Sequence, residues 1–187
     1  MAGGASRRMG ADKALVEIEG TPMLLVAHQA LVGAGASRRI VVGGDEVSYR
    51  RVLPDLETVP DEYPGEGPLG GIITALRRLS QEQERQAQAR VVILACDLPG
   101  VCASSVAAVL DVMDSHPGAQ VCVAAHRGRL EPLHAVWRPS ALPQVEAAFG
   151  AGERAVHAVI ESIEAVVVEG LDETWLRNVN SPDDLAR

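Results

Sequence analysis

The chain has 187 residues, of which 47% are hydrophobic but only 3% aromatic, so we expect an aliphatic core in a single domain over residues 1–187. Its 17 basic and 25 acidic side chains give a formal net charge of −8, which argues against non-specific binding to nucleic acid or anionic membranes. No apolar run reaches the length of a membrane span and no signal peptide opens the sequence, so we expect a cytoplasmic protein.

Short apolar runs alternate along the chain with longer amphipathic segments. Continuous runs rich in β-branched residues are typical of strands that helices cover on both faces. The runs span residues 40–42, 91–95, 121–125 and 165–168. Helical spacing of hydrophobic residues is found in residues 23–32, 69–79, 106–113 and 156–163. This alternation predicts an α/β fold of three layers, α/β/α, around a Rossmann-like, mostly parallel sheet.

Proline and capping residues indicate where some of these helices begin and end. Thr21 and Pro22 predict an N-cap followed by proline at the first helical position. Residues 181–184, Ser-Pro-Asp-Asp, predict the start of a last helix in the same way. Residues 80–90 are polar all round and contain good helix formers, so we expect an exposed helix tail there.

The cysteines and histidines give little sign of catalytic chemistry. Cys96, Cys102 and Cys122 are an odd number without C-x-x-C spacing, so we expect reduced, buried thiols and neither disulfides nor a zinc site. No Ser-His-Asp or Cys-His arrangement is visible, which leaves little support for hydrolysis through a nucleophilic side chain. His134, in residues 131–137, could face the site, but core packing is the simpler expectation for a lone histidine without a partner.

The first segment with chemical character is the glycine-rich stretch from Gly3 to Lys13. Its three glycines allow backbone N–H groups to approach an anion closely, and two arginines and Lys13 supply positive charge for a polyphosphate. It matches neither the Walker A loop nor the dinucleotide fingerprint. A flexible basic N-terminus is the alternative at this point.

The second segment, residues 61–71, is rich in glycine and proline and leads into a predicted helix. The pair Gly70-Gly71 costs that helix about 1 kcal/mol per residue relative to alanine. Such a cost suggests that something approaches the backbone closely, and we favour a ligand over an ordinary strand-to-helix connection.

The third segment is Cys96-Asp97-Leu98-Pro99, directly after the most apolar run. In open α/β sheets, ligands bind beyond the carboxyl ends of the strands. A single carboxylate there, near a basic phosphate loop, suits Mg²⁺, which takes one or two protein carboxylates together with phosphate oxygens and water. A helix-capping role before Pro99 is the alternative, but the three loops together favour a metal.

Five segments, in the order of the chain, match motifs of one family. They are Met1-Ala2-Gly3-Gly4 through Asp12-Lys13, Asp61 with Tyr63-Pro64 and Gly67-Pro68-Leu69, Cys96-Asp97-Leu98-Pro99, Ala151-Gly152-Glu153-Arg154, and Asn178-Val179-Asn180-Ser181-Pro182. With them, nearly the whole chain resembles the molybdenum cofactor guanylyltransferase (MobA) family, within the nucleotidyltransferase superfamily of glycosyltransferase-A-like fold. The sequence departs from the family at Gly43, where members often carry Asn.

The resemblance implies a nucleotide-diphospho-sugar transferase-like fold and a reaction. GMP would pass from GTP to the molybdopterin cofactor with release of pyrophosphate, and Mg²⁺ would be the cofactor. The attacking group is then an ionised phosphate, so the protein supplies positioning and charge neutralisation and no base. The residues that the resemblance implies for GTP are Ala2, Gly3, Gly4, Lys13, Asp61 and Asp97. The catalytic residues are Arg8, Lys13 and Asp97, with Asp97 as the metal ligand, and the candidates for the pterin side are Arg154, Asn178 and Asn180.

Two rival functions remain at this point. A cytidylyltransferase, or another small nucleotidyltransferase, would share the fold, but cytidylyltransferases typically have Ala-Ala-Gly in the first loop and lack Gly-Pro-Leu in the second. A non-catalytic carrier of the cofactor belongs to a different class, and the presence of both Lys13 and Asp97 argues against it. Transient contact with molybdoenzymes or their chaperones is expected in either case.

The start of the sequence leads to a further expectation. Only Met1 and Ala2 precede the glycine pair, too few for the strand of about five residues that normally holds a phosphate loop. We therefore expect the natural chain to begin several residues earlier with an apolar run. The alternative is that Met1 is genuine and the loop becomes ordered when nucleotide binds.

Overall fold

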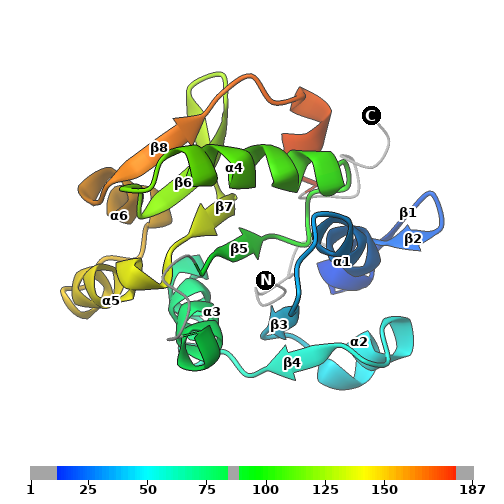
Figure 1. Cartoon of the computed structure of the whole chain (residues 1–187). Coiled ribbons are helices and arrows are strands. Elements are labelled where there is room, and N and C mark those ends of the chain that lie inside the picture. Colours follow the sequence, from blue (N-terminus) through cyan, green and yellow to red (C-terminus); the bar gives the residue numbers. More distant parts are fainter. Residues whose placement is uncertain (1–11, 84–88, 180–187) are drawn as a thin grey trace.

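The structure is a computed structural model that describes residues 12–83 and 89–179 (Figure 1). Its α-helices are α1 (Met23–Gly33), α2 (Glu46–Val52), α3 (Pro68–Gln83), α4 (Ala103–Ser115), α5 (Leu142–Gly150) and α6 (Val156–Ser162). Its strands are β1 (Glu17–Ile18), β2 (Thr21–Pro22), β3 (Ile40–Val42), β4 (Glu57–Val59), β5 (Val91–Leu94), β6 (Val121–His126), β7 (Arg129–Trp137) and β8 (Ala165–Val168). Short 3-10 turns are η1 (Lys13–Leu15), η2 (Pro139–Ala141) and η3 (Glu173–Leu176). Within these residues, no helix combines the length and the apolar character needed to cross a membrane.

The four apolar runs and the four amphipathic segments form strands and helices as predicted. The predicted cap at Thr21 is wrong, because Pro22 is the N-cap residue of α1 and no side chain caps that helix. Both residues instead form β2, which pairs with β1. The predicted helix at residues 181–184 and part of the predicted helix tail, residues 84–88, lie outside the described residues.

The main sheet has the order β5-β7-β6-β8 and combines parallel and antiparallel pairs. β6 pairs in parallel with β8, and β7 runs antiparallel to both of its neighbours. The sequence did not predict β7, because Pro132 and the charged residues near it interrupt its apolar pattern. Pro132 is tolerated because the register of β6 against β7 shifts between Val123 and Ala124, where β7 carries extra residues.

Helices cover both faces of this sheet. Val121 and Val123 of β6 pack into a core shared with α3, α5 and α6, whereas Cys122 and Ala124 pack with residues of α4 on the opposite face. Because successive side chains of a strand point to opposite faces, this division confirms the three-layer arrangement. Cys96 and Cys122 are buried free thiols as predicted, but Cys102 is partly exposed at the start of α4.

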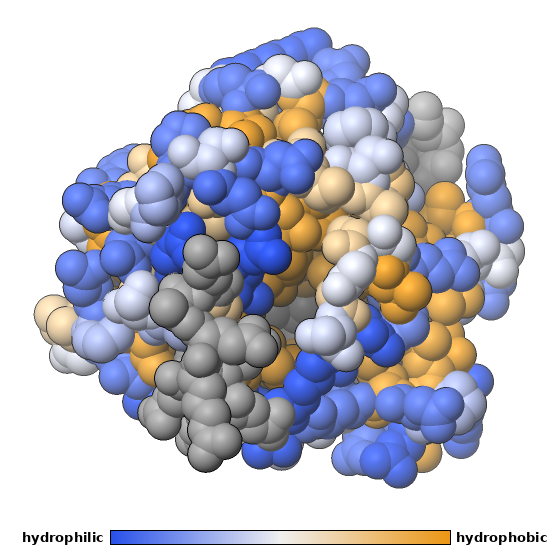
Figure 2. All heavy atoms as spheres, viewed as in Figure 1, coloured by the Kyte–Doolittle hydropathy of each residue, from blue (hydrophilic) through white to orange (hydrophobic). Residues whose placement is uncertain are grey.

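β3 and β4 form a separate parallel pair on the other side of a cavity from β5. The cavity has a volume of about 260 Å³, and its walls include residues of α1, β3, α3, β5 and α4. Figure 2 shows hydrophobic atoms in a hollow of this face, over the region between β3 and β5. Within the described residues, each of these two strands pairs along one edge only.

Candidate active site

The site begins at a tight turn that carries Lys13. Asp12 is the N-cap of η1, and its Oδ1 accepts a hydrogen bond of 3.0 Å from the backbone N–H of Ala14. The backbone N–H of Leu15 donates to the Asp12 carbonyl at 3.0 Å and closes the turn. The turn therefore forms because Asp12 directly precedes it and accepts a hydrogen bond from an N–H group at the start of the turn.

Asp97 lies opposite this turn, beyond the carboxyl end of β5. The distance between Lys13 Nζ and Asp97 Oδ2 is 3.6 Å, and the two side chains are 24% and 26% exposed. Asp97 Oδ1 is buried and has no hydrogen-bond partner within the described residues. The alternative role of Asp97 as a helix cap is wrong, because the N-cap of α4 is Cys102.

The Asp97 carboxylate fits a divalent cation that is also held by phosphate groups. A buried carboxylate oxygen without a hydrogen-bond partner is costly unless something else satisfies it. Within the described ranges, no three His, Cys, Asp or Glu side chains form a cluster that could hold a metal. A complete protein cage is therefore not formed there, and a single carboxylate is the donor set that Mg²⁺ uses when phosphates and water supply its other ligands.

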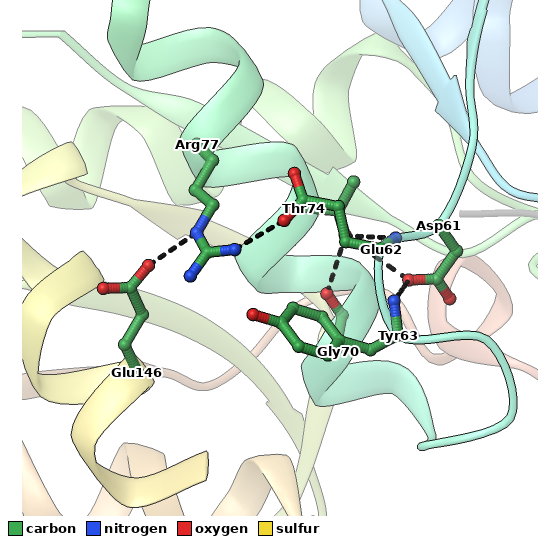
Figure 3. Close-up of polar contacts among 7 residues, drawn as sticks. All are labelled: Asp61, Glu62, Tyr63, Gly70, Thr74, Arg77 and Glu146. Atoms are coloured by element: carbon green, nitrogen blue, oxygen red, sulfur yellow. Dashed lines mark hydrogen bonds and ion pairs between the residues drawn. The ribbon is translucent and has the colours of Figure 1, made fainter. Parts of the chain in front are cut away.

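The second loop is held from within by Asp61 and Thr74 (Figure 3). Asp61 Oδ1 accepts hydrogen bonds from the backbone N–H of Tyr63 at 3.0 Å and from the Thr74 hydroxyl at 3.3 Å. Thr74, which is fully buried in α3, accepts in turn from the backbone N–H of Glu62 at 3.1 Å. These bonds fix the loop and the direction of the Asp61 carboxylate.

The expected reason for the glycine pair in α3 is wrong at Gly70. A Cβ added there would collide with the Cβ of Tyr63, so the close approach comes from the loop's own side chain and not from a ligand. The Tyr63 ring then packs against Phe149 of α5, with 4.7 Å between the ring centroids. Gly70 is thus explained by packing between the loop and two helices.

Arginines tie the second loop to the α5 region. Arg77 of α3 forms ion pairs with Glu62 and with Glu146 of α5, and these hydrogen bonds raise the pKa of the guanidinium (Figure 3). Arg154 donates to Glu66 Oε2 at 2.7 Å, and its guanidinium carbon lies 3.9 Å from the Phe149 ring centroid. Arg154 therefore lies beside the second loop, held by loop and helix contacts.

Asn178 is brought beside Asp97 by the C-terminal segment. The backbone N–H of Val179 donates to the Asp97 carbonyl at 2.9 Å, and Asn178 Nδ2 donates to Glu131 Oε2 of β7 at 3.2 Å. The structure thus brings Lys13 into direct contact with Asp97, and it brings Asn178 near Asp97 through the neighbouring Val179. Asp61 and Arg154 lie apart from this group, in the second loop and beside it. Ala2, Gly3, Gly4, Arg8 and Asn180 lie outside the described residues.

Two residues with contacts to the site were not predicted from the sequence. Tyr49 of α2 donates a hydrogen bond to Asp12, and Glu131 accepts one from Asn178. Neither residue lies in one of the five motifs. Both contact the site only because the packing of helices and strands brings distant parts of the chain together. His134 is buried in the core as expected, and burial lowers the pKa of its imidazole.

Comparisons with known proteins show the family to which the chain belongs. A family model described as the MobA-like NTP transferase domain matches residues 1–166. The "Probable molybdenum cofactor guanylyltransferase" of Deinococcus radiodurans is 35% identical over 186 residues, covering 99% of this chain and 89% of that protein. The "Molybdenum cofactor guanylyltransferase" of Pseudomonas entomophila is 33% identical, covering 98% of this chain and 92% of that protein.

A solved structure supports the same assignment. The crystal structure of molybdopterin-guanine dinucleotide biosynthesis protein A from Archaeoglobus fulgidus has a TM-score of 0.73 at 25% identity. The match covers 99% of this chain and 92% of that one. The five-motif resemblance and the fold class are confirmed: the chain belongs to the MobA-like NTP transferase family.

Proposed function

We propose that the protein transfers GMP from GTP to the molybdopterin cofactor, forming the guanine dinucleotide cofactor and pyrophosphate. The observation that carries this proposal is the pairing of Lys13 with Asp97 at the carboxyl end of β5. A nucleoside triphosphate with its cation needs a positive group for the phosphates beside a carboxylate for the metal. Lys13 supplies the ammonium group, and Asp97 supplies a carboxylate with one buried oxygen that has no hydrogen-bond partner within the described residues. Relatives named for guanylyl transfer support the choice of reaction.

In this proposal, the residues act by position and charge. Lys13 neutralises phosphate oxygens of GTP during an in-line displacement, and its compact ammonium can follow a phosphate as charge redistributes. Asp97 holds Mg²⁺, which when bound stabilises negative charge on the transferred and leaving phosphates. Asp61 remains the proposed nucleotide ligand on the second loop, where Tyr63 and Thr74 hold its carboxylate in place.

We assign the pterin side to Asn178, in the segment that contacts Asp97, and to Arg154, beside the second loop. Asn178 precedes Val179, whose backbone N–H binds the Asp97 carbonyl, and its side-chain amide donates to Glu131. Arg154 can bind an anionic pterin phosphate once its guanidinium exchanges the Glu66 contact, since both side chains are partly exposed. Ala2, Gly3, Gly4, Arg8 and Asn180 retain the roles that the family resemblance implies for them.

Pyrophosphate release tests this function directly. Purified protein is incubated with molybdopterin, GTP and Mg²⁺, and released pyrophosphate is measured with and without EDTA. We expect release that requires all three components. Binding of molybdopterin without any release would contradict the transferase and favour a non-catalytic carrier. Undiminished release with EDTA would contradict the metal role of Asp97.

A further inference from the structure

We propose that Tyr49 is a positioning residue for Lys13, acting through Asp12 on the turn that carries the lysine. This inference rests on the proposed function, because it takes Lys13 as the group that binds the phosphates. Tyr49 lies in α2, which belongs to none of the five motifs that identify the family.

Hydrogen bonds connect Tyr49 to the lysine turn through the two oxygens of one carboxylate. The Tyr49 hydroxyl donates to Asp12 Oδ2 at 2.6 Å, a length typical of a charge-assisted hydrogen bond. The other oxygen, Oδ1, accepts from the Ala14 N–H at 3.0 Å and caps the turn. Because Asp12 uses one oxygen for α2 and the other for the turn, Tyr49 fixes the carboxylate that caps the lysine turn.

Tyr49 belongs to the same buried cluster as a sequence neighbour of each member of the Lys13–Asp97 pair. Tyr49 is fully buried in a hydrophobic cluster that includes Ala14 and Cys96, the residues that follow Lys13 and precede Asp97. Burial and the Asp12 hydrogen bond raise the pKa of the phenol, so it stays protonated and able to donate at neutral pH. A Cβ added at Gly44 would collide with the hydroxyl, so the backbone of Gly44 closes over it.

Removal of this hydroxyl changes the electrostatics around the lysine. Asp12 Oδ2 would lose its charge-assisted hydrogen bond in a partly buried setting, where unsatisfied charge is costly. The carboxylate is then free to rotate toward the adjacent ammonium and to compete with the triphosphate for it. The expected defect is therefore in GTP binding and not in binding of molybdopterin.

The test is a double-mutant cycle of Tyr49→Phe and Lys13→Ala in the full chain. Tyr49→Phe keeps the buried ring and removes only the donor, so we expect the KM for GTP to rise about tenfold, the loss typical of one hydrogen bond to a charged group. The KM for molybdopterin should not change. In the Lys13→Ala background, Tyr49→Phe should have no further effect on the KM for GTP.

Leu56→Val is the matched control for a loss of stability. Leu56 packs in the same hydrophobic cluster as Tyr49, but its side chain has no hydrogen-bonding atom. This variant should lower the melting temperature and leave both KM values unchanged. If Tyr49→Phe does not fold, Asp12→Asn tests the same competition from the other side. Its amide oxygen can still cap the turn, but it carries no charge to compete for Lys13, so the KM for GTP should not rise, and a tenfold rise would overturn the competition.

A second readout does not depend on activity. Lys13 is the only lysine of the chain, so lysine labelled with ¹³C gives one side-chain Hε–Cε signal in NMR spectra. Tyr49→Phe should shift this signal and Leu56→Val should not. If wild-type protein transfers no GMP, the proposed function fails while the signal still tests the positioning. An unshifted lysine signal, or additive effects in the cycle, would overturn the role of Tyr49.

Discussion

Substitution of Asp97 by Asn separates catalysis from stability in this protein. The change replaces one carboxylate oxygen by an amide nitrogen. It retains the size of the side chain and removes the negative charge that faces Lys13. Both side chains of this pair are about a quarter exposed, at 24% and 26%, so solvent screens their interaction. An ion pair of that kind contributes about 1 kcal/mol or less to folding, and we expect the free energy of unfolding to change by no more than this.

The expected effect on turnover is much larger. A metal ion that polarises phosphate oxygens stabilises the transition state by several kcal/mol, and each ~1.4 kcal/mol is a factor of ten in rate. The amide introduced by Asp97→Asn would be a poor ligand at the buried position of Oδ1, so we expect kcat to fall by at least about 100-fold. Binding of GTP without metal should change little, because the substitution removes no donor to the phosphates.

The assay compares pyrophosphate release, calorimetric binding of GTP with and without Mg²⁺, and urea unfolding. Asp55→Asn is the matched control, since Asp55 is an exposed aspartate in the loop before β4. Near-normal kcat of Asp97→Asn at saturating Mg²⁺ would refute the metal role of Asp97. A large loss of stability would refute the screened ion pair.

Three other predictions concern binding and stability. Lys13→Ala should weaken binding of GTP and lower turnover, measured by calorimetry and pyrophosphate release; unaltered kinetics would remove Lys13 from the site. Hydrogen bonds from Arg38 and Arg78 lower the pKa of Glu57, so the Glu57→Gln variant should be less stable than wild type by about 1 kcal/mol at pH 7. In urea unfolding, that difference should be complete above about pH 4.3 and vanish as the pH falls through the native pKa; a difference independent of pH would contradict it. Burial lowers the pKa of His134, so the folded protein binds a proton there less readily than the unfolded chain. Below about pH 6.5, the stability of the wild-type protein should therefore fall more steeply with decreasing pH than that of His134→Gln, by up to ~1.4 kcal/mol per pH unit. Equal slopes for the two proteins would contradict the burial of a neutral imidazole.

The parts of the fold that follow from the sequence are those with a regular hydrophobic pattern. β6 was predicted because its apolar residues are continuous, as in a strand buried on both faces. α3 was predicted because its buried residues recur at helical spacing along one face. β7 was not, because Pro132 lies at a register shift that only the pairing with β6 reveals. The short helices α2 and α5 were also missed, since each fully buries a single residue, whereas α6, of similar length, buries three at helical spacing.

The candidate site was predictable where chemistry is local in the sequence. Asp97 follows an apolar strand, and Lys13 follows glycines and arginines, so both were identified from their neighbours. Gly70 was misread, since the tyrosine that needs its missing side chain lies seven residues earlier and approaches only in the folded loop. Tyr49 and Glu131 reach the site across the fold, and no spacing in the sequence marks such contacts.

The identity of the transferred nucleotide tests the proposed function most directly. Purified protein, molybdopterin and Mg²⁺ are incubated with GTP, CTP, ATP and UTP separately, and the products are identified by mass spectrometry. We expect a dinucleotide cofactor of mass corresponding to the addition of GMP, formed from GTP and absent with the Asp97→Asn protein. Efficient formation of the cytosine dinucleotide from CTP, with none from GTP, would contradict guanylyl transfer.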